Sequence, residues 1–279
     1  GKTWRRIDQF PGVPRFTYVT DVFASLRDAN TVFVALNNWH LGDYKPYIVK
    51  SNDRGRTWAN ISGNLPAKHD VWSVVQDHVN ANLLFAGTEF GVFVSVDAGT
   101  NWTALKGGLP SIQVRDMQVQ KRETDLATAT FGRGFYVLDD YSALREVTAG
   151  ALTEEARLFP LRHAYSFNST GLGPAGSAGI GTLSGNWQVA NPPFGAVFTY
   201  NVRQALPENT KLVLTIENQA GQQVRRCELD KTAGLRRVAW GLVPDAPVTP
   251  AGRGAGGGGR GGATGDSAAT STTPTMQPC

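Results

Sequence analysis

The sequence predicts an all-β protein, on three observations. An eight-residue pattern occurs twice, 44 positions apart. Short runs of β-branched and other apolar residues alternate with turn-forming residues along most of the chain, which is typical of strands joined by tight turns. Glycine (32 residues) and proline (15 residues) are frequent among the 279 residues, as many turns require.

The repeated pattern reads S-x-D-x-G-x-x-W. The first copy, residues 51–58, is called box 1 here, and the second copy, residues 95–102, is called box 2. Residues 1–4 match the last half of box 1, so the box tryptophans are separated by 54 and then 44 positions. Repetition at this interval indicates four-stranded units such as the blades of a β-propeller. The residues that define the two boxes are Ser51, Asp53, Gly55, Trp58, Ser95, Asp97, Gly99 and Trp102.

Each box is predicted to form a turn between two strands. Its aspartate can accept hydrogen bonds from backbone N–H groups of its own turn, and its glycine supplies a positive φ. Its tryptophan then lies on the outgoing strand and covers the turn. The alternative, that Asp53 and Asp97 are acid/base carboxylates, is weaker because the aspartate repeats with its turn, whereas function is usually found at one site.

Strand-like runs divide the first part of the chain into about three blades. The predicted strands are residues 18–25, 31–36, 47–51, 71–77, 83–88, 91–95, 114–119, 126–130 and 134–138. The third blade has no box, and residues 139–141 take its place. Residues 1–145 are therefore predicted to be the C-terminal blades of a partial β-propeller.

The composition changes after this part. Residues 146–190 are interpreted as a linker, because residues 169–185 are rich in glycine, serine and alanine. Four further strand-like runs within residues 191–245 predict a small, partial β-sandwich of immunoglobulin-like or fibronectin-like type. Residues 246–279 form a low-complexity Gly/Arg/Ser/Thr tail, which has too few apolar residues to bury a core.

Charge and cysteine content narrow the classes of function. The net charge is +4 and the basic residues are scattered, so nucleic acid is not an expected partner. No apolar run of about 18 residues exists, and no membrane span is predicted. Because the chain opens inside a repeat, we expect an internal fragment whose upstream propeller blades and export signal precede it, in an extracellular or periplasmic protein. A disulfide between Cys227 and Cys279 is possible, but two cysteines are no framework.

The two boxes, together with residues 86–93 and 130–140, resemble Asp-box (BNR-type) β-propellers. That group includes sialidases, xyloglucanase-type hydrolases, photosystem-assembly propellers and the sortilin ectodomain. The likeness is closest to large secreted bacterial proteins labelled sortilin-like or glycosyl-hydrolase-like, in which a sandwich module with a motif similar to residues 191–196 follows the propeller. Because binding modules and enzymes share the box, the resemblance implies a fold and not an activity.

Candidate functional residues lie outside the boxes. Trp39, His40 and Tyr44 occupy a long loop and could form an aromatic ledge for a sugar or peptide, although a loop packed on the propeller is the simpler interpretation. Glu89 lies in a tight connection and could face the centre of the propeller, or could be an exposed turn residue. Arg133 is a candidate anion contact or an inter-blade hydrogen-bond donor. The other carboxylates outside the boxes that we considered are Asp21, Asp43, Asp70, Asp116, Asp139 and Asp140.

No cofactor or metal is predicted. The four histidines lack metal-type spacing, and no phosphate-binding glycine motif precedes a helix. The leading hypothesis is a non-catalytic extracellular scaffold or binding module that presents a propeller face to a protein, peptide or glycan. The alternative is a glycoside hydrolase of sialidase/xyloglucanase type whose carboxylates lie partly outside this fragment, and a third hypothesis is one piece of an extracellular assembly.

Overall fold

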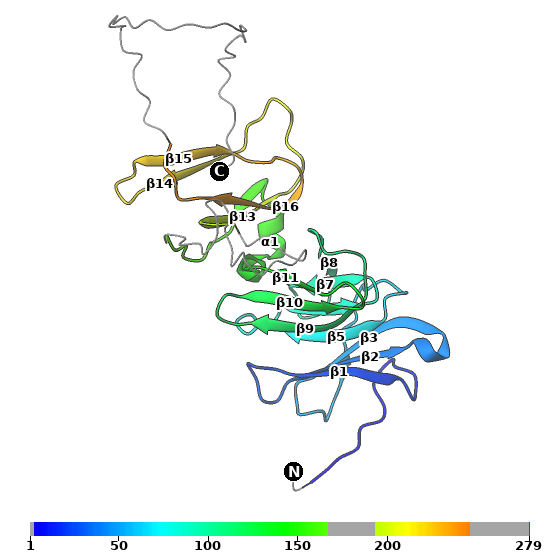
Figure 1. Cartoon of the computed structure of the whole chain (residues 1–279). Coiled ribbons are helices and arrows are strands. Elements are labelled where there is room, and N and C mark those ends of the chain that lie inside the picture. The colour runs from blue at the N-terminus through cyan, green and yellow to red at the C-terminus, as the bar shows by residue number, and fades with distance from the viewer. Residues whose placement is uncertain (1–2, 167–192, 246–278) are drawn as a thin grey trace, which may run out of the picture. The chain divides into compact units, whose positions relative to one another are not determined.

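The computed structural model describes residues 3–166, 193–245 and 279 (Figure 1). It divides into two compact units, residues 1–152 and 153–279, which are described separately. The prediction of an all-β chain is confirmed, because nearly all regular structure is antiparallel strand. Most of the predicted linker, part of the 191–196 motif and nearly all of the predicted tail lie outside the described residues.

The first unit contains three antiparallel sheets, each made of consecutive strands. Sheet 1 has the order β1 (Tyr18–Ala24), β2 (Val32–Asn38), β3 (Asp43–Ser51) and β4 (Ala59–Asn60), with the short helix η1 (Trp39–Leu41) after β2. Sheet 2 has the order β5 (Val71–Gln76), β6 (Leu84–Thr88), β7 (Gly91–Ser95) and β8 (Thr103–Ala104). Sheet 3 contains β9 (Val114–Gln120), β10 (Asp125–Thr130) and β11 (Phe135–Leu138).

The sheets stack face to face in a propeller-like manner, and β5 lies against β1 and β2 on one side and β9 on the other. Because successive side chains of a strand point to opposite faces, β2 contributes to two cores. Phe33 and Ala35 pack between sheets 1 and 2, while Val34 and Leu36 pack with Phe10 on the other face. Burial on both faces explains why this strand reads as a continuous apolar run.

The first strand of each sheet carries an irregularity at the same place. The register skips Thr20 in β1, Trp72 in β5 and Arg115 in β9. A β-bulge of this kind re-aims one side chain and bends the strand locally. In all three sheets, a bulge therefore turns one side chain of the first strand out of the regular alternation between the two faces.

The aspartate of each box accepts hydrogen bonds from its own turn. Asp53 Oδ1 accepts from the backbone N–H groups of Arg56 at 2.9 Å and Thr57 at 2.8 Å, and its Oδ2 accepts from the Thr57 hydroxyl at 2.6 Å. Asp97 accepts from the backbone N–H of Asn101 at 2.8 Å and from its side-chain amide at 2.7 Å. These bonds lower the pKa of Asp53, and for Asp97 they outweigh burial and also lower the pKa.

Each box packs against a chain segment that follows the preceding box tryptophan. Gly99 has φ +94° and so little space that an added Cβ would lie 2.8 Å from Ile61, whose carbonyl accepts a hydrogen bond from Trp102 Nε1 at 2.9 Å. In box 1, an added Cβ at Gly55 would lie 3.1 Å from Ile7. Ile7 and Ile61 stand at the same distance after a tryptophan, so the partial copy at the start of the chain supplies the same packing as the complete one.

A buried ionic cluster follows sheet 3. Tyr141 and the short helix η2 (Ser142–Glu146) bring a hydroxyl and a guanidinium onto the fully buried Asp77. Tyr141 donates to Asp77 at 2.8 Å, and Arg145 donates through two nitrogens, each at 2.8 Å. Burial is the largest single influence and would raise the pKa of Asp77, but the hydrogen bonds from Arg145, Asn80 and Tyr141 together outweigh it and lower the pKa. The box-free end of the third sheet is thus fastened to sheet 2 by ion pairing, and the short helix α1 (Ala149–Thr153) follows.

The second unit has two small antiparallel sheets. One contains β12 (Ala156–Leu158), β13 (Ala196–Val202) and β16 (Gly234–Trp240), and the other contains β14 (Val213–Glu217) and β15 (Gln223–Glu228). Ala196 and Phe198 of β13 share a core with Leu214 of β14, so the two sheets of this unit pack against each other. Residues 156–158 lie within the range predicted as a linker. In the structure they form strand β12, because all three pair with β13.

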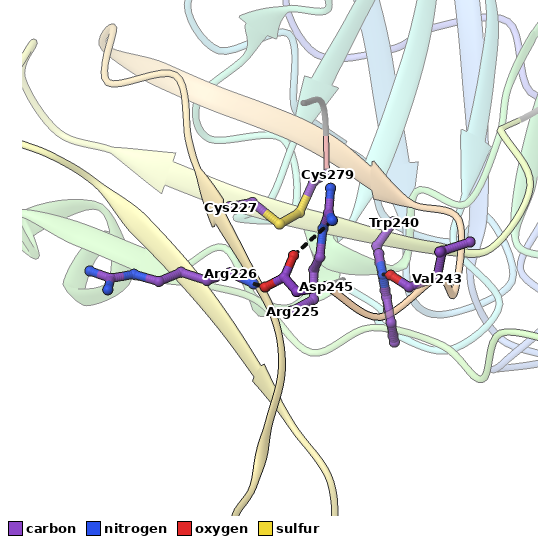
Figure 2. The surroundings of a disulfide bond; sticks show 7 residues. All are labelled: Arg225, Arg226, Cys227, Trp240, Val243, Asp245 and Cys279. Atoms are coloured by element: carbon purple, nitrogen blue, oxygen red, sulfur yellow. Dashed lines mark hydrogen bonds and ion pairs between the residues drawn. A yellow bond between two sulfur atoms is a disulfide. The ribbon is translucent and has the colours of Figure 1, made fainter. Parts of the chain in front are cut away.

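A disulfide joins Cys227 of β15 to Cys279, with their Cα atoms 5.4 Å apart (Figure 2). The sequence left this pairing open. Asp245 lies beside it and accepts hydrogen bonds from the Arg225 guanidinium at 2.8 Å and the Arg226 backbone N–H at 3.0 Å. Position 279 is therefore covalently fixed to the sheet of the second unit.

Candidate functional site: an aromatic groove

The first unit contains an open groove of about 730 Å³. It is formed where the loop after β2, the segment before β5, the β6–β7 hairpin and the start of β9 meet. Its aromatic lining is Trp39, Tyr44, Trp72, Phe90 and Phe131. Its charged and amide lining is Lys68, Asp70, Glu89, Gln113 and Arg115.

Two bulge residues meet in the groove. The Arg115 guanidinium carbon lies 3.7 Å from the centre of the Trp72 ring and 5.2 Å from that of Phe131. Arg115 Nε donates to Gln113 Oε1 at 2.6 Å. A guanidinium held by a stacked indole and an amide is pre-organised, so it can bind an oxygen acceptor with little loss of side-chain entropy.

Glu89 is fixed at the turn between β6 and β7. Its Oε2 accepts hydrogen bonds from Trp72 Nε1 at 3.0 Å and Gln113 Nε2 at 2.5 Å. Its backbone N–H donates to the Asp70 carbonyl at 2.9 Å, which places the two acidic residues side by side. The β6–β7 turn therefore delivers a carboxylate of defined orientation to the groove.

Asp70 forms part of the floor of the groove and is only 3% exposed. Neither of its carboxylate oxygens accepts a hydrogen bond from the described part of the chain, and Oδ1 is completely buried. Burial, reinforced by the charges of Glu89 and Asp43, raises the pKa of Asp70 to about 6. Asp43 itself is held by the Tyr47 hydroxyl at 2.6 Å. Within the described part of the chain, Asp70 is thus a buried acid without a hydrogen-bond partner, which is costly in a protein interior.

The sequence-based candidates fall into two groups. Trp39, Tyr44 and Glu89 line the groove. His40 stacks on Trp39 with ring centres 3.6 Å apart and is not part of the lining, and Arg133 lies exposed in the turn before β11, also outside the lining.

The sequence does not mark Trp72 and Arg115 as site residues. They are equivalent bulge positions of successive blades, so an alignment of the blades pairs them. The sequence marks Asp70 only as one carboxylate among several. Nothing in its neighbouring residues signals that it is buried and unpartnered.

Within residues 3–166, 193–245 and 279, no group of three or more His, Cys, Asp or Glu side chains could hold a metal ion. In the same residues, no helix has the length and apolar character needed to cross a membrane.

No family model matches the chain, and no curated protein matches it. Among solved structures, the chain is similar to a GH74 enzyme of Niastella koreensis, with 17% identity over 44% of this chain and 21% of that one at a TM-score of 0.37. YCF48 bound to a D1 peptide is 15% identical over 50% of this chain and 42% of that one, at 0.37. A GH74 xyloglucanase from Xanthomonas campestris is 15% identical over 76% of this chain and 28% of that one, at 0.34.

The aligned part is thus less than half the length of each of these solved chains. Because the TM-scores are below 0.5, the function argued below rests on the geometry of this chain alone.

Proposed function

We propose that the first unit is a non-catalytic binding module that takes an extended ligand into the groove. The observation that carries this proposal is the combination of exposed rings with polar groups that the protein itself leaves unbonded. Trp39 is 40% exposed, and Tyr44 and Phe90 are each 51% exposed. Concave sites of this kind, apolar with a few placed polar groups, are the usual form of ligand sites.

The polar groups of the groove are oriented before any ligand arrives. Glu89 keeps one carboxylate oxygen without a hydrogen bond from the described residues, while its other oxygen is bonded twice. Arg115 uses Nε internally, and its terminal nitrogens form no hydrogen bond or ion pair with other described residues. Since ordering these side chains is already achieved, a ligand binds at a lower entropic cost.

The test is a titration of the full chain with separate pools of peptides and of neutral oligosaccharides, followed by NMR of the indole N–H groups. We expect the Trp72 signal to shift with one pool, since its indole bonds Glu89 in the groove. The double variant Trp39→Ala/Phe90→Ala should weaken the shift about tenfold or more. Exposed Trp4 serves as an internal control, and equal shifts at both indoles, or none at Trp72, would refute binding in the groove.

A second candidate function is glycoside hydrolysis, favoured by one observation. Glycosidases pair a carboxyl group of raised pKa, as acid, with an ionised carboxylate. Asp70, with its pKa raised to about 6, lies beside Glu89 in the groove. Release of reducing sugar from a polysaccharide, abolished in Glu89→Gln, would replace the binding proposal with this one.

We further propose that boxes 1 and 2 are Asp boxes of the BNR type and that the chain belongs to an exported, sortilin-like protein. The disulfide supports export, because disulfides persist mainly in oxidising compartments. The compartment is tested by fractionating the native cell and comparing the thiol reactivity of the protein before and after reduction.

A further inference from the structure

Two acidic side chains, Asp70 and Glu89, line the groove, and Asp43 lies near Asp70 but outside the lining. Asp70 interacts electrostatically with both Glu89 and Asp43. Lys68 and Arg115 also line the groove, but neither forms an ion pair with these carboxylates within the described residues. Within the described residues, Asp70 and Glu89 therefore have no ion-pair partner, whereas Asp43, outside the lining, interacts with Lys45.

Asp70 and Asp77 are both buried aspartates of this unit, but their hydrogen-bond partners differ. Asp77 is equally buried, yet it receives hydrogen bonds from Tyr141, from Arg145 and from the backbone N–H groups of Val79 and Asn80. Asp70 is only 3% exposed and lines the groove, yet it receives no hydrogen bond from the side chains or backbone of the described residues. A buried carboxylate is normally bonded or paired, so a partner from outside the chain is the direct explanation.

The walls beside these carboxylates are aromatic. Trp39, Tyr44 and Phe90 are exposed rings of the same groove. Aromatic faces attract cations, and the attraction increases when the cation is removed from water. Arg115 already shows this arrangement within the protein, because its guanidinium stacks on Trp72 next to Glu89.

We propose that the floor of the groove receives a lysine or arginine side chain of an extended peptide, with Asp70 and Glu89 as its charge partners and the exposed rings as its walls. The inference rests on the proposed function. A sugar hydroxyl could bond one oxygen of Asp70, but it would leave the shared negative charge uncompensated. The terminal nitrogens of Arg115 are donors for backbone carbonyls, which a peptide supplies alongside its basic side chain.

The experiment uses the full chain and short peptides capped at both ends. One pool carries a central lysine or arginine, and a matched pool carries norleucine or citrulline, which keep the shape and remove the charge. Binding is followed by isothermal calorimetry and by the Trp72 indole signal. We expect the basic pool to bind about tenfold or more tightly than the neutral pool, with affinity that falls as salt is added.

Asp70→Asn should remove this preference while leaving the Trp72 signal in its native position. Asp116→Asn is the matched control, because Asp116 is an exposed carboxylate next to Arg115 and does not line the groove. Its preference for basic peptides should match that of the unmodified chain.

The outcomes separate the two proposals. Equal binding of the basic and neutral pools, or unchanged preference in Asp70→Asn, would overturn the basic-peptide inference and leave groove binding intact. Binding of oligosaccharides but of no peptide would also overturn the basic-peptide inference and leave groove binding intact. No response of Trp72 to any pool would remove both proposals.

Discussion

Asp97 and Asp70 belong to the same blade and differ in almost every contact. Asp97 accepts hydrogen bonds from Ser95 and, twice, from Asn101, and its pKa is lowered. Asp70 accepts none from the residues that the structure describes, and its pKa is raised to about 6 by burial and neighbouring charge. The box completes its own hydrogen bonds and needs no ligand. In the groove, Asp70 lacks such bonds. This difference in hydrogen bonding distinguishes a structural aspartate from a candidate binding aspartate within the same blade.

The largest expected effect concerns Asp77, the fully satisfied buried counterpart of Asp70. Asp77→Ala should lower the free energy of unfolding by about 3–5 kcal/mol, because Arg145 would be left buried without its charge partner. Urea unfolding followed by tryptophan fluorescence measures the loss. Asp125→Ala, at the start of β10, gives a comparison for a less buried carboxylate. If Asp77→Ala lowered the free energy of unfolding no more than Asp125→Ala does, the hydrogen bonds and ion pair of Asp77 would not be a main source of stability.

Asp70→Asn should have the opposite sign and increase the free energy of unfolding at pH 7 by about 2 kcal/mol. The pKa of Asp70 is raised in the folded chain. The stability that Asp70 contributes is therefore fully present below about pH 4 and is lost as pH rises through about 6. The variant and the unmodified chain should therefore converge in stability at low pH. Urea unfolding across this range tests the prediction, and a destabilised variant at pH 7 would show that Asp70 has an internal partner.

Asp97→Ala should cost about 1 kcal/mol, the usual loss when a side chain that bonds turn N–H groups is removed. Asp97→Asn should cost less, because the amide oxygen can still accept the bond from Asn101. Neither change should affect peptide or glycan binding in the groove. Thermal unfolding together with the Trp72 indole signal checks both statements. If the Asp97→Ala variant remained fully folded but no longer bound ligands in the groove, a purely structural role of Asp97 would be contradicted.

The strands and the boxes could be predicted from sequence because their signals are local. The run at β2 is apolar because both of its faces are buried, and the box carries its turn chemistry within eight residues. The groove could not be predicted in the same way, since Trp39, Asp70, Glu89 and Arg115 come from separate segments. Stacking of the sheets and the repeated bulges bring them together. Glu89 was found because its turn is short, whereas the burial of Asp70 depends on neighbours distant in sequence.

The covalent link between Cys227 and Cys279 changes how cleavage of the backbone by a protease would be detected. A protease that cuts the backbone once between these positions would not release a fragment, because the sulfur bridge holds both pieces together. On a non-reducing gel such a molecule would run close to intact, and only a reducing gel would reveal two bands. Intact mass measured without reductant would increase by one water after such a single cut.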